Sequence, residues 1–457
     1  MNTALPLPLS LIMLLAVATP VRAQAPEPQP PTGGSETDQE VEKLRKRVEE
    51  LERKLGSVTD KVEETELEKI VKEAEAEAKA PEEEAKPEQR EFLWGALALQ
   101  KLNPEISFCG DLVSQLVLNG DKYYAGRDDR SGMPVREIGL NFEHLLDPYS
   151  RFKAAINFMP WPDAQVEVEE VYITWFGVIP SLSLTVGRFR HDFGILNRWH
   201  GHDLDQTDYP LALTLALGEG GLLGNGFAVK WFMPPLWAHA NELTVAVTDG
   251  ESETLFAGEY FSVPVGLVHL KNYYDLSEST YLELGLSGAF GANNRRGYVP
   301  EGHDELEDED WRRTMVFGAD LTLHWQPPRQ AKYRSLTWRT EYYFVDKQTP
   351  DDADGTRQSW GLYSYIDYQL GTRWFAGVRG DAALPTIRAP FNDKDIAWDV
   401  VPYLTFWQSE FVYLRLEYRH GENIPHTKED GTLARRTDNR VVLQVDFAAG
   451  PHKHEKY

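Results

Sequence analysis

From Glu105 onward the sequence alternates between apolar and polar residues in short runs that turn residues separate. The run 412–419 shows the two faces clearly, with Val412, Leu414, Leu416 and Tyr418 opposite Tyr413, Arg415, Glu417 and Arg419. Successive side chains of a strand point to opposite faces, so the pattern predicts strands with one apolar face and one charged face. Its repetition predicts an all-β domain over residues 105–450.

The connections between these runs also alternate. Seven short connections, such as 147–150 and 276–279, are interleaved with eight others that are mostly longer, such as 194–221. The count is 16 strands, provided that 255–261 is a loop. Outer-membrane barrels have an even number of antiparallel strands, short turns at one rim and longer loops at the other. We therefore expect a 16-stranded antiparallel transmembrane β-barrel with its apolar face outside.

The first 104 residues have a different organisation. An apolar core followed by Val21-Arg22-Ala23 predicts a signal peptide over residues 1–23, and a short membrane anchor is the weaker alternative. A Pro/Gly-rich linker follows over 24–40. Apolar residues at spacings of three and four predict a periplasmic coiled coil within the helical segment 41–80, although a single surface helix would show a similar stripe. A linker over 81–104 and a periplasmic C-terminal tail over 451–457 complete the chain.

Charge and composition limit the classes of molecule that the chain is expected to bind. The formal net charge at pH 7 is −25, which argues against nucleic acid as a partner. Cys109 is the only cysteine, so the chain contains no internal disulfide. The expected partners are outer-membrane lipid, small solutes or ions, and further copies of this chain, with the cell wall as a partner of the coiled coil.

The segment 184–194, LTVGRFRHDFG, resembles the strand-to-loop segment of the phosphate-selective porins O and P, a family of bacterial outer-membrane porins. The matching positions are Gly187, Arg188, Phe189, Arg190 and Phe193. The resemblance implies a trimeric 16-stranded channel with a loop folded into the pore. The family's phosphate preference rests on lumenal Arg and Lys, whereas this barrel sequence carries an excess of Asp and Glu.

Strict alternation from Val186 would turn Arg188 and Arg190 toward lipid, which costs about 2–4 kcal/mol for each arginine near the midplane. A bulge at or near Gly187 would bring both inside. Pairing across the preceding turn then predicts Glu170 beside Arg190 and Tyr172 beside Arg188. With residues of the loop 194–221, the predicted pore constriction consists of Glu170, Tyr172, Arg188, Arg190, Trp199, Asp203 and Asp205.

The same alternation predicts the charged residues of the lumen. They are Glu283, Asp320, His324, Arg339, Glu341, Arg379, Asp381, Arg415, Glu417, Arg419 and Asp446. Both signs are present, and unpaired charges in a dry core would be costly, so we expect a water-filled lumen in which these groups stay solvated and tune ion selectivity. Pairing of neighbouring Arg and Glu that holds the barrel together is an equally open interpretation.

His200 and His202 form a His-x-His pair that can bind a metal ion in an extended segment, because alternate residues share a face. A polar loop that hydrogen-bonds to the barrel is the alternative, and His452 with His454 repeats the spacing near the end. The sequence predicts no other cofactor.

We expect a porin of the bacterial outer membrane that permits passive diffusion through a lumen narrowed by residues 194–221. A structural tether acting through the coiled coil is the alternative, and it is compatible with a channel. An outer-membrane enzyme is less favoured, because the sequence contains no Gly-x-Ser-x-Gly motif, and His202 with Asp203 or Asp205 is the only acid–histidine pair of interest.

Overall fold

The computed structural model describes residues 105–118, 131–160, 165–252, 254–256, 263–293, 311–348, 356–386, 395–427 and 433–450. The predicted signal peptide, both linkers, the coiled coil and the C-terminal tail lie outside these residues. In the part of the chain that the structure describes, no helix has the length and apolar character of a membrane span.

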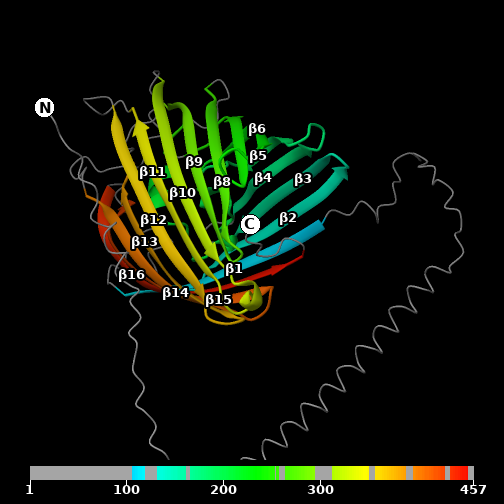
Figure 1. Cartoon of the computed structure of the whole chain (residues 1–457). Coiled ribbons are helices and arrows are strands. Elements are labelled where there is room, and N and C mark those ends of the chain that lie inside the picture. Colours follow the sequence, from blue (N-terminus) through cyan, green and yellow to red (C-terminus); the bar gives the residue numbers. More distant parts are fainter. Residues whose placement is uncertain are drawn as a thin grey trace, which may run out of the picture. The chain divides into compact units, whose positions relative to one another are not determined.

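Sixteen antiparallel strands form a closed barrel in which each strand pairs with the next and β16 pairs with β1 (Figure 1). The strands are β1 (Glu105–Val117), β2 (Val135–Asp147), β3 (Ser150–Met159), β4 (Gln165–Phe176), β5 (Leu182–Arg190), β6 (Leu223–Met233), β7 (Ala240–Thr248), β8 (Val265–Ser277), β9 (Thr280–Asn293), β10 (Arg312–Trp325), β11 (Leu336–Lys347), β12 (Arg357–Gln369), β13 (Trp374–Leu384), β14 (Ala397–Trp407), β15 (Val412–Thr427) and β16 (Leu433–Ala449). The predicted strand number and antiparallel order are confirmed. The count of 16 assumed that 255–261 is a loop, and the described residues between β7 and β8 form no strand.

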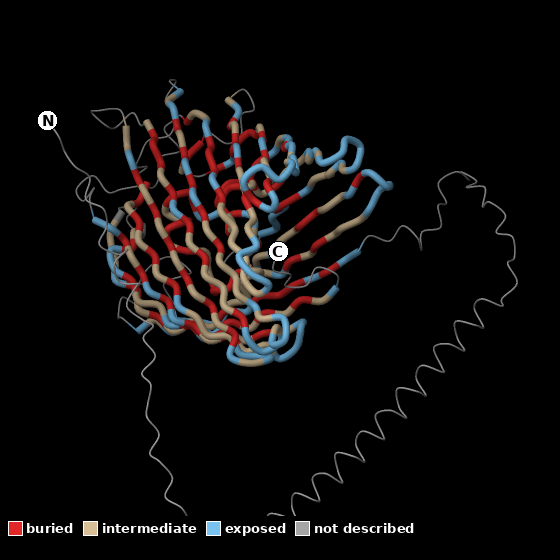
Figure 2. The backbone as a smooth tube through the Cα atoms, viewed as in Figure 1, coloured by how far each residue is buried: buried red, intermediate tan, exposed pale blue. Residues whose placement is uncertain are grey.

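Alternation of the two faces is visible along the strands (Figure 2). In β15, Arg415 and Glu417 are buried, whereas Leu416 and Tyr418 are exposed. The exposed apolar side chains continue around the barrel and include Leu184, Val186, Phe227, Val229, Leu286, Phe290, Phe317 and Leu443. An apolar outer face and a polar inner face are the arrangement of a transmembrane barrel and the reverse of a soluble sandwich.

Exposed aromatic residues gather at the rim with the short turns. They are Tyr149, Trp175, Trp231, Phe232, Trp237, Tyr333, Trp374 and Phe411. Trp and Tyr have an apolar ring and a polar group, which suits the boundary between lipid and water. Their position is that of an aromatic girdle at one edge of the apolar band.

The predicted bulge at Gly187 is wrong. Pairing of β5 with β4 and with β6 runs through Gly187 without a shift of register. Tyr172 therefore pairs with Gly187 rather than with Arg188. The irregularity lies in β4, where Ala155 pairs with Glu170 and Ile156 pairs with Val168. Glu169 is the extra residue, so it is buried together with its neighbour Glu170.

Gly187 has a different role from the predicted one. Its φ is +139°, and a Cβ atom there would lie 2.2 Å from the carbonyl oxygen of Val171 and 2.7 Å from Cα of Tyr172. Only glycine combines this φ with so close an approach of the neighbouring strand. The fifth strand ends at Arg190, and the last strand reaches Ala449.

Candidate pore constriction

The connection between β5 and β6, residues 191–222, folds into the barrel. It contains two 3₁₀ turns, η4 (Leu196–Arg198) and η5 (Gly201–Asp203), and one short helix, α2 (Leu211–Leu217). The helix follows Pro210, whose ring pre-sets φ, and ends at Gly218, which has a φ of +101°. Its buried residues are Ala212, Leu213, Ala216 and Leu217, and they form one face against β11, β12 and β13.

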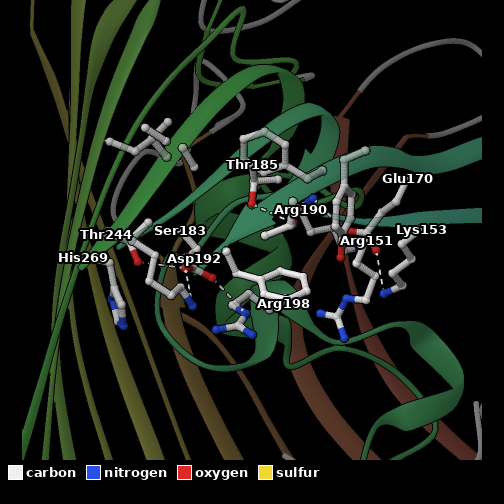
Figure 3. A pocket seen from close by; sticks show the side chains of 18 of the residues that line it. Arg151, Lys153, Glu170, Ser183, Thr185, Arg190, Asp192, Arg198, Thr244 and His269 are labelled. Atoms are coloured by element: carbon white, nitrogen blue, oxygen red, sulfur yellow. Dashed lines mark hydrogen bonds and ion pairs between the residues drawn. The ribbon is translucent and has the colours of Figure 1, made fainter. Parts of the chain in front are cut away.

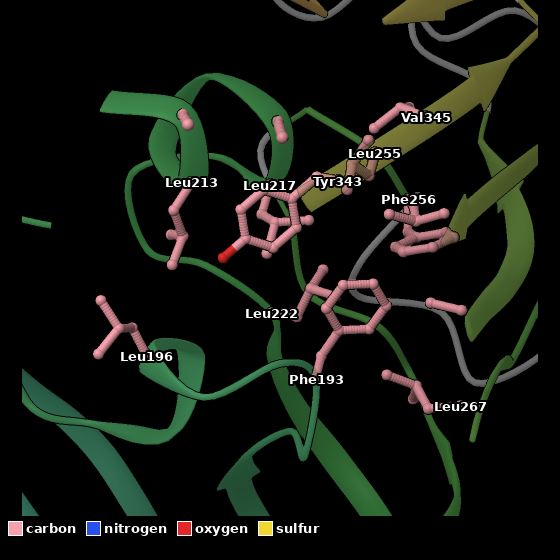
Figure 4. Close-up of a cluster of buried hydrophobic side chains, with 14 of the residues drawn as sticks. Phe193, Leu196, Leu213, Leu217, Leu222, Leu255, Phe256, Leu267, Tyr343 and Val345 are labelled. Carbon is pink, nitrogen blue, oxygen red and sulfur yellow. The ribbon is translucent and has the colours of Figure 1, made fainter. Parts of the chain in front are cut away.

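Apolar packing holds this loop inside the barrel. Phe193, Leu196, Leu213, Leu217 and Leu222 of the loop form one buried cluster with side chains of the barrel and of the next loop (Figure 4). The partners are Leu255, Phe256, Leu267, Tyr343, Val345, Tyr363 and Tyr365. Burying one Leu or Phe side chain contributes about 1.5–3 kcal/mol, so the cluster strongly favours the folded-in position.

Hydrogen bonds join the loop to strands on the far side of the barrel. Three loop amides donate to buried carboxylates, namely Leu196 to Glu341 (2.9 Å), Thr207 to Glu417 (2.7 Å) and Ala212 to Asp381 (3.1 Å). Two loop carbonyls accept from buried guanidinium groups, namely Leu204 from Arg415 (2.9 Å) and Asp208 from Arg379 (2.9 Å). The loop therefore crosses the lumen from β5 to β11–β15 and divides it.

The predicted lumenal charges face inward, but the expectation that they stay solvated is wrong for most of them. Eight are buried, namely Asp320, Arg339, Glu341, Arg379, Asp381, Arg415, Glu417 and Asp446. Their contacts explain the burial, because several hold the loop and Arg379 also donates to Asp381 (2.7 Å). Three others are less enclosed: Glu283 pairs with Lys271 (3.0 Å), His324 bonds Thr337 (2.9 Å), and Arg419 pairs with Asp208 (3.0 Å).

Near β4 the loop meets a compact group of charges. Glu169 accepts from Arg190 Nε (2.6 Å) and contacts His200 Nδ1 (2.8 Å). Glu170 accepts from the Arg190 amide (3.0 Å) and from Lys153 (3.0 Å), and it lies 3.2 Å from His200 Nε2. The register shift in β4 makes this possible, since it turns two consecutive carboxylates toward the lumen.

His200 lies in the loop between these two carboxylates. Burial lowers its pKa, but the charge of Glu169 and hydrogen bonds to Glu169 and Glu170 outweigh burial, and the pKa rises to about 9 despite the opposing charge of Lys153. His200 is therefore a cation at neutral pH, and its charge holds the loop against β4.

This pairing predicts a pH-dependent stability. A raised folded-state pKa stabilises the folded protein fully below the unfolded value of 6.5, and that contribution is lost as the pH rises toward about 9. We expect the stability difference between the parent protein and His200→Gln to shrink over this window. Chemical unfolding of both proteins at several pH values measures it. A difference that is constant with pH would show that His200 is not held as a cation.

The predicted constriction residues separate into two groups. Five of them, Glu170, Tyr172, Arg190, Trp199 and Asp203, line one cavity of about 540 Å³ between the loop and β2–β8 (Figure 3). Other charged or titratable side chains that line the cavity, and that sequence reasoning did not single out, are those of Arg151, Lys153, Asp192, Arg198, Lys230 and His269.

The predicted position of Arg188 in the pore constriction is wrong. It shares the face of Leu184 and Val186, donates to the Val168 carbonyl (2.9 Å) and forms an ion pair with Glu251, so it is outside the cavity. The bulge that would have turned it inward is absent from β5, and its charge is instead neutralised at the loop end of the strand.

Asp205 and Trp199 both contact Arg339. The Asp205 carboxylate accepts from Arg339 (3.0 Å) and from the Tyr365 hydroxyl (2.7 Å). The Trp199 ring lies under the same guanidinium, 4.6 Å from its centroid. Asp205 therefore holds the loop to β11 and β12 and does not line the cavity.

The two histidines of the His-x-His pair have different surroundings. Their rings are stacked, with centroids 5.6 Å apart. His200 faces the carboxylates of β4, whereas His202 Nδ1 lies near Glu137 (3.3 Å) and Cys109 (3.5 Å). Sequence reasoning did not single out Cys109 and Glu137. Residues of β1 and β2 are distant from the loop in sequence and come near it only when the barrel closes.

No protein-family model matches the sequence. An uncharacterized protein of Aquifex aeolicus (strain VF5) is 29% identical over 345 residues, which span 69% of each chain. The crystal structure of the outer membrane channel DcaP of Acinetobacter baumannii superposes with a TM-score of 0.50 at 11% identity, covering 76% of this chain and 98% of that one. OprB of Pseudomonas putida gives a TM-score of 0.46 at 12% identity, with 78% and 97% covered. The chain has the fold of the outer-membrane porins.

Proposed function

We propose that this chain is an outer-membrane porin through which small hydrophilic solutes or ions diffuse passively, without catalysis. The observation that carries the proposal is the loop 191–222, which narrows a closed barrel while leaving a polar cavity beside it. A loop folded inside such a barrel sets the width and charge of a pore. The apolar outer face and the aromatic rim support insertion in the outer membrane, and a homotrimer is the proposed assembly.

We further propose that the pore prefers anions, in line with the resemblance to the phosphate-selective porins. The most accessible charges of the cavity are basic, since the Arg151 and Arg198 side chains are 48% and 42% exposed. Among the acidic side chains that line the cavity, Asp192 is 14% and Glu170 6% exposed. Glu143, which pairs with Arg151 (3.0 Å) and is 39% exposed, does not line the cavity. A passing ion therefore meets positive charge first, although the chain as a whole is acidic.

Planar-bilayer recording of the purified protein tests both statements. We expect ion current, and in a potassium chloride gradient a reversal potential of the sign that anion preference gives. The charge reversals Arg151→Glu and Arg198→Glu should each move that potential toward cation preference. Absence of current from correctly folded protein would contradict the channel function.

A matched control is available in the turn between β10 and β11, away from the cavity. Arg329 lies on the exposed turn η6 (Pro328–Gln330) and does not line the cavity, so Arg329→Glu makes the same change of charge elsewhere. We expect its reversal potential to equal that of the parent. If all three variants shift equally, the cavity does not determine selectivity.

A further inference from the structure

At one contact between the loop 191–222 and the barrel, the side chains do not form a simple ion pair. Cys109 of β1, Glu137 of β2 and His202 of η5 present a sulfur, a carboxylate and an imidazole whose ligand atoms all lie within 4.8 Å of one another. Cys109 and His202 are buried, and the thiol lies over Gly139, whose missing side chain leaves space for it. Three separate elements thus bring these groups to one point.

The spacing of the atoms matches that around a metal ion. Two ligands of a tetrahedral zinc ion, at bond lengths of about 2.0–2.3 Å, lie roughly 3.3–3.8 Å apart. The Cys109 Sγ to His202 Nδ1 distance is 3.5 Å, and the His202 Nδ1 to Glu137 Oε1 distance is 3.3 Å. Both distances therefore fit ligands that share one ion.

Charge and orientation fit as well. A thiolate and a carboxylate together offset the two charges of a zinc ion, so the enclosed site would be neutral. Asp203 Oδ1 lies 3.7 Å from His202 Nε2, the ring nitrogen turned away from the thiol. Proteins usually orient a metal-binding histidine by a hydrogen bond from the second ring nitrogen to a carboxylate, and 3.7 Å is an ion-pair distance slightly longer than such a bond. Arg136, the nearby cation, is bound to Asp111 and Asp208.

The geometry points to a transition-metal site for Zn²⁺ or a similar soft divalent ion, with Cys109, Glu137 and His202 as ligands and Asp203 as the residue that positions His202. Since His202 belongs to the loop and the other ligands to β1 and β2, the bound ion ties the constriction to the barrel. In the described residues His200 is not part of this group, so the ligand that accompanies His202 is Cys109 and not the other histidine of the pair. The site rests on side-chain geometry and does not require the barrel to conduct.

Titration of the full-length, chelator-treated protein with Co²⁺ alone, and by calorimetry with Zn²⁺ alone, tests the site. His452 and His454, which lie outside the described residues, are replaced by Asn in every sample to remove that His-x-His pair. We expect one ion per chain and, with Co²⁺, the near-ultraviolet absorption band of a thiolate bound to cobalt. Cys109→Ser should abolish the band, and His202→Gln should abolish saturable binding.

Two further variants sharpen the result. Asp203→Asn should weaken Zn²⁺ binding by about 10–100-fold while keeping the thiolate band, as expected of a positioning residue. His324→Gln removes a lumenal histidine that bonds Thr337 and does not belong to the group of Cys109, Glu137 and His202, and this variant should bind Zn²⁺ like the parent. No thiolate band in the parent, or the same Zn²⁺ affinity in the parent, Cys109→Ser and His202→Gln, overturns the site. The parent's own band keeps the test decisive even if a variant fails to fold.

Discussion

Replacing residues 196–217 with a short Gly/Ser linker is expected to raise the single-channel conductance severalfold. The loop crosses the lumen and holds to β11–β15 through its backbone, so the deletion removes the groups that occupy the middle of the barrel. Conductance follows the cross-section of the narrowest part of a pore, and without the loop that part is the barrel itself.

The barrel is expected to survive this deletion. Every strand pairs with its two neighbours, and none of these ladders includes a residue of the loop. Wall charges that now hold the loop, such as Glu417 and Arg415, would be hydrated in a wider lumen instead of being left unpaired in a dry one. Circular dichroism and the gel mobility of unheated and heated samples verify folding before the recording.

A control deletion at the turn rim separates width from disturbance. Residues 328–333 lie in the turn between β10 and β11 and are largely exposed, so their removal leaves the loop 191–222 in place. We expect its conductance to remain near that of the parent. A folded barrel without residues 196–217 that conducts like the parent would show that the loop is not the limiting constriction.

Strand number and facing were predictable because they depend on local patterns. The two-residue period assigns Arg415 and Glu417 to the inside wherever pairing is regular, and both are inside. The period fails where a strand gains a residue. The consecutive carboxylates Glu169 and Glu170 interrupt the alternation of β4, and this pattern, which the prediction at Gly187 did not use, marks the strand that contains the irregularity.

The filling of the lumen was less predictable, because it depends on contacts between distant segments. The stretch 211–217, LALTLAL, is too short for its pattern to distinguish a helix from a strand. Its apolar face is buried in a cluster that includes Tyr343 and Tyr363, which are distant in sequence. Likewise Cys109 and His202 are 93 positions apart in sequence, and only closure of the barrel brings them together. Alternation gives the direction of a side chain but not what fills the space in front of it.

Removal of the Arg379 guanidinium is expected to cause the largest loss of stability among single substitutions of the lumen. Its side chain is fully buried, donates to Asp381 (2.7 Å) and lies 3.9 Å from Asp399. Asp381 and Asp399 are direct partners across β13 and β14, so Arg379→Met leaves two facing carboxylates with less positive charge between them. Breaking a buried ion pair in this way costs about 3–5 kcal/mol, which urea unfolding of the refolded barrel in detergent measures.

Two comparisons decide whether charge is the cause. The double variant Arg379→Met/Asp381→Leu removes the pair together and should recover part of the loss, because replacing both partners of a buried pair by apolar residues is often neutral, whereas the Ala212 amide loses its acceptor. Arg313→Met breaks an ion pair with Asp346 (2.9 Å) whose arginine side chain is 52% exposed, and it should cost less than about 1 kcal/mol. If Arg379→Met is no more destabilising than Arg313→Met, water reaches Asp381 and Asp399, and the lumen beneath the loop is as wet as alternation alone had suggested.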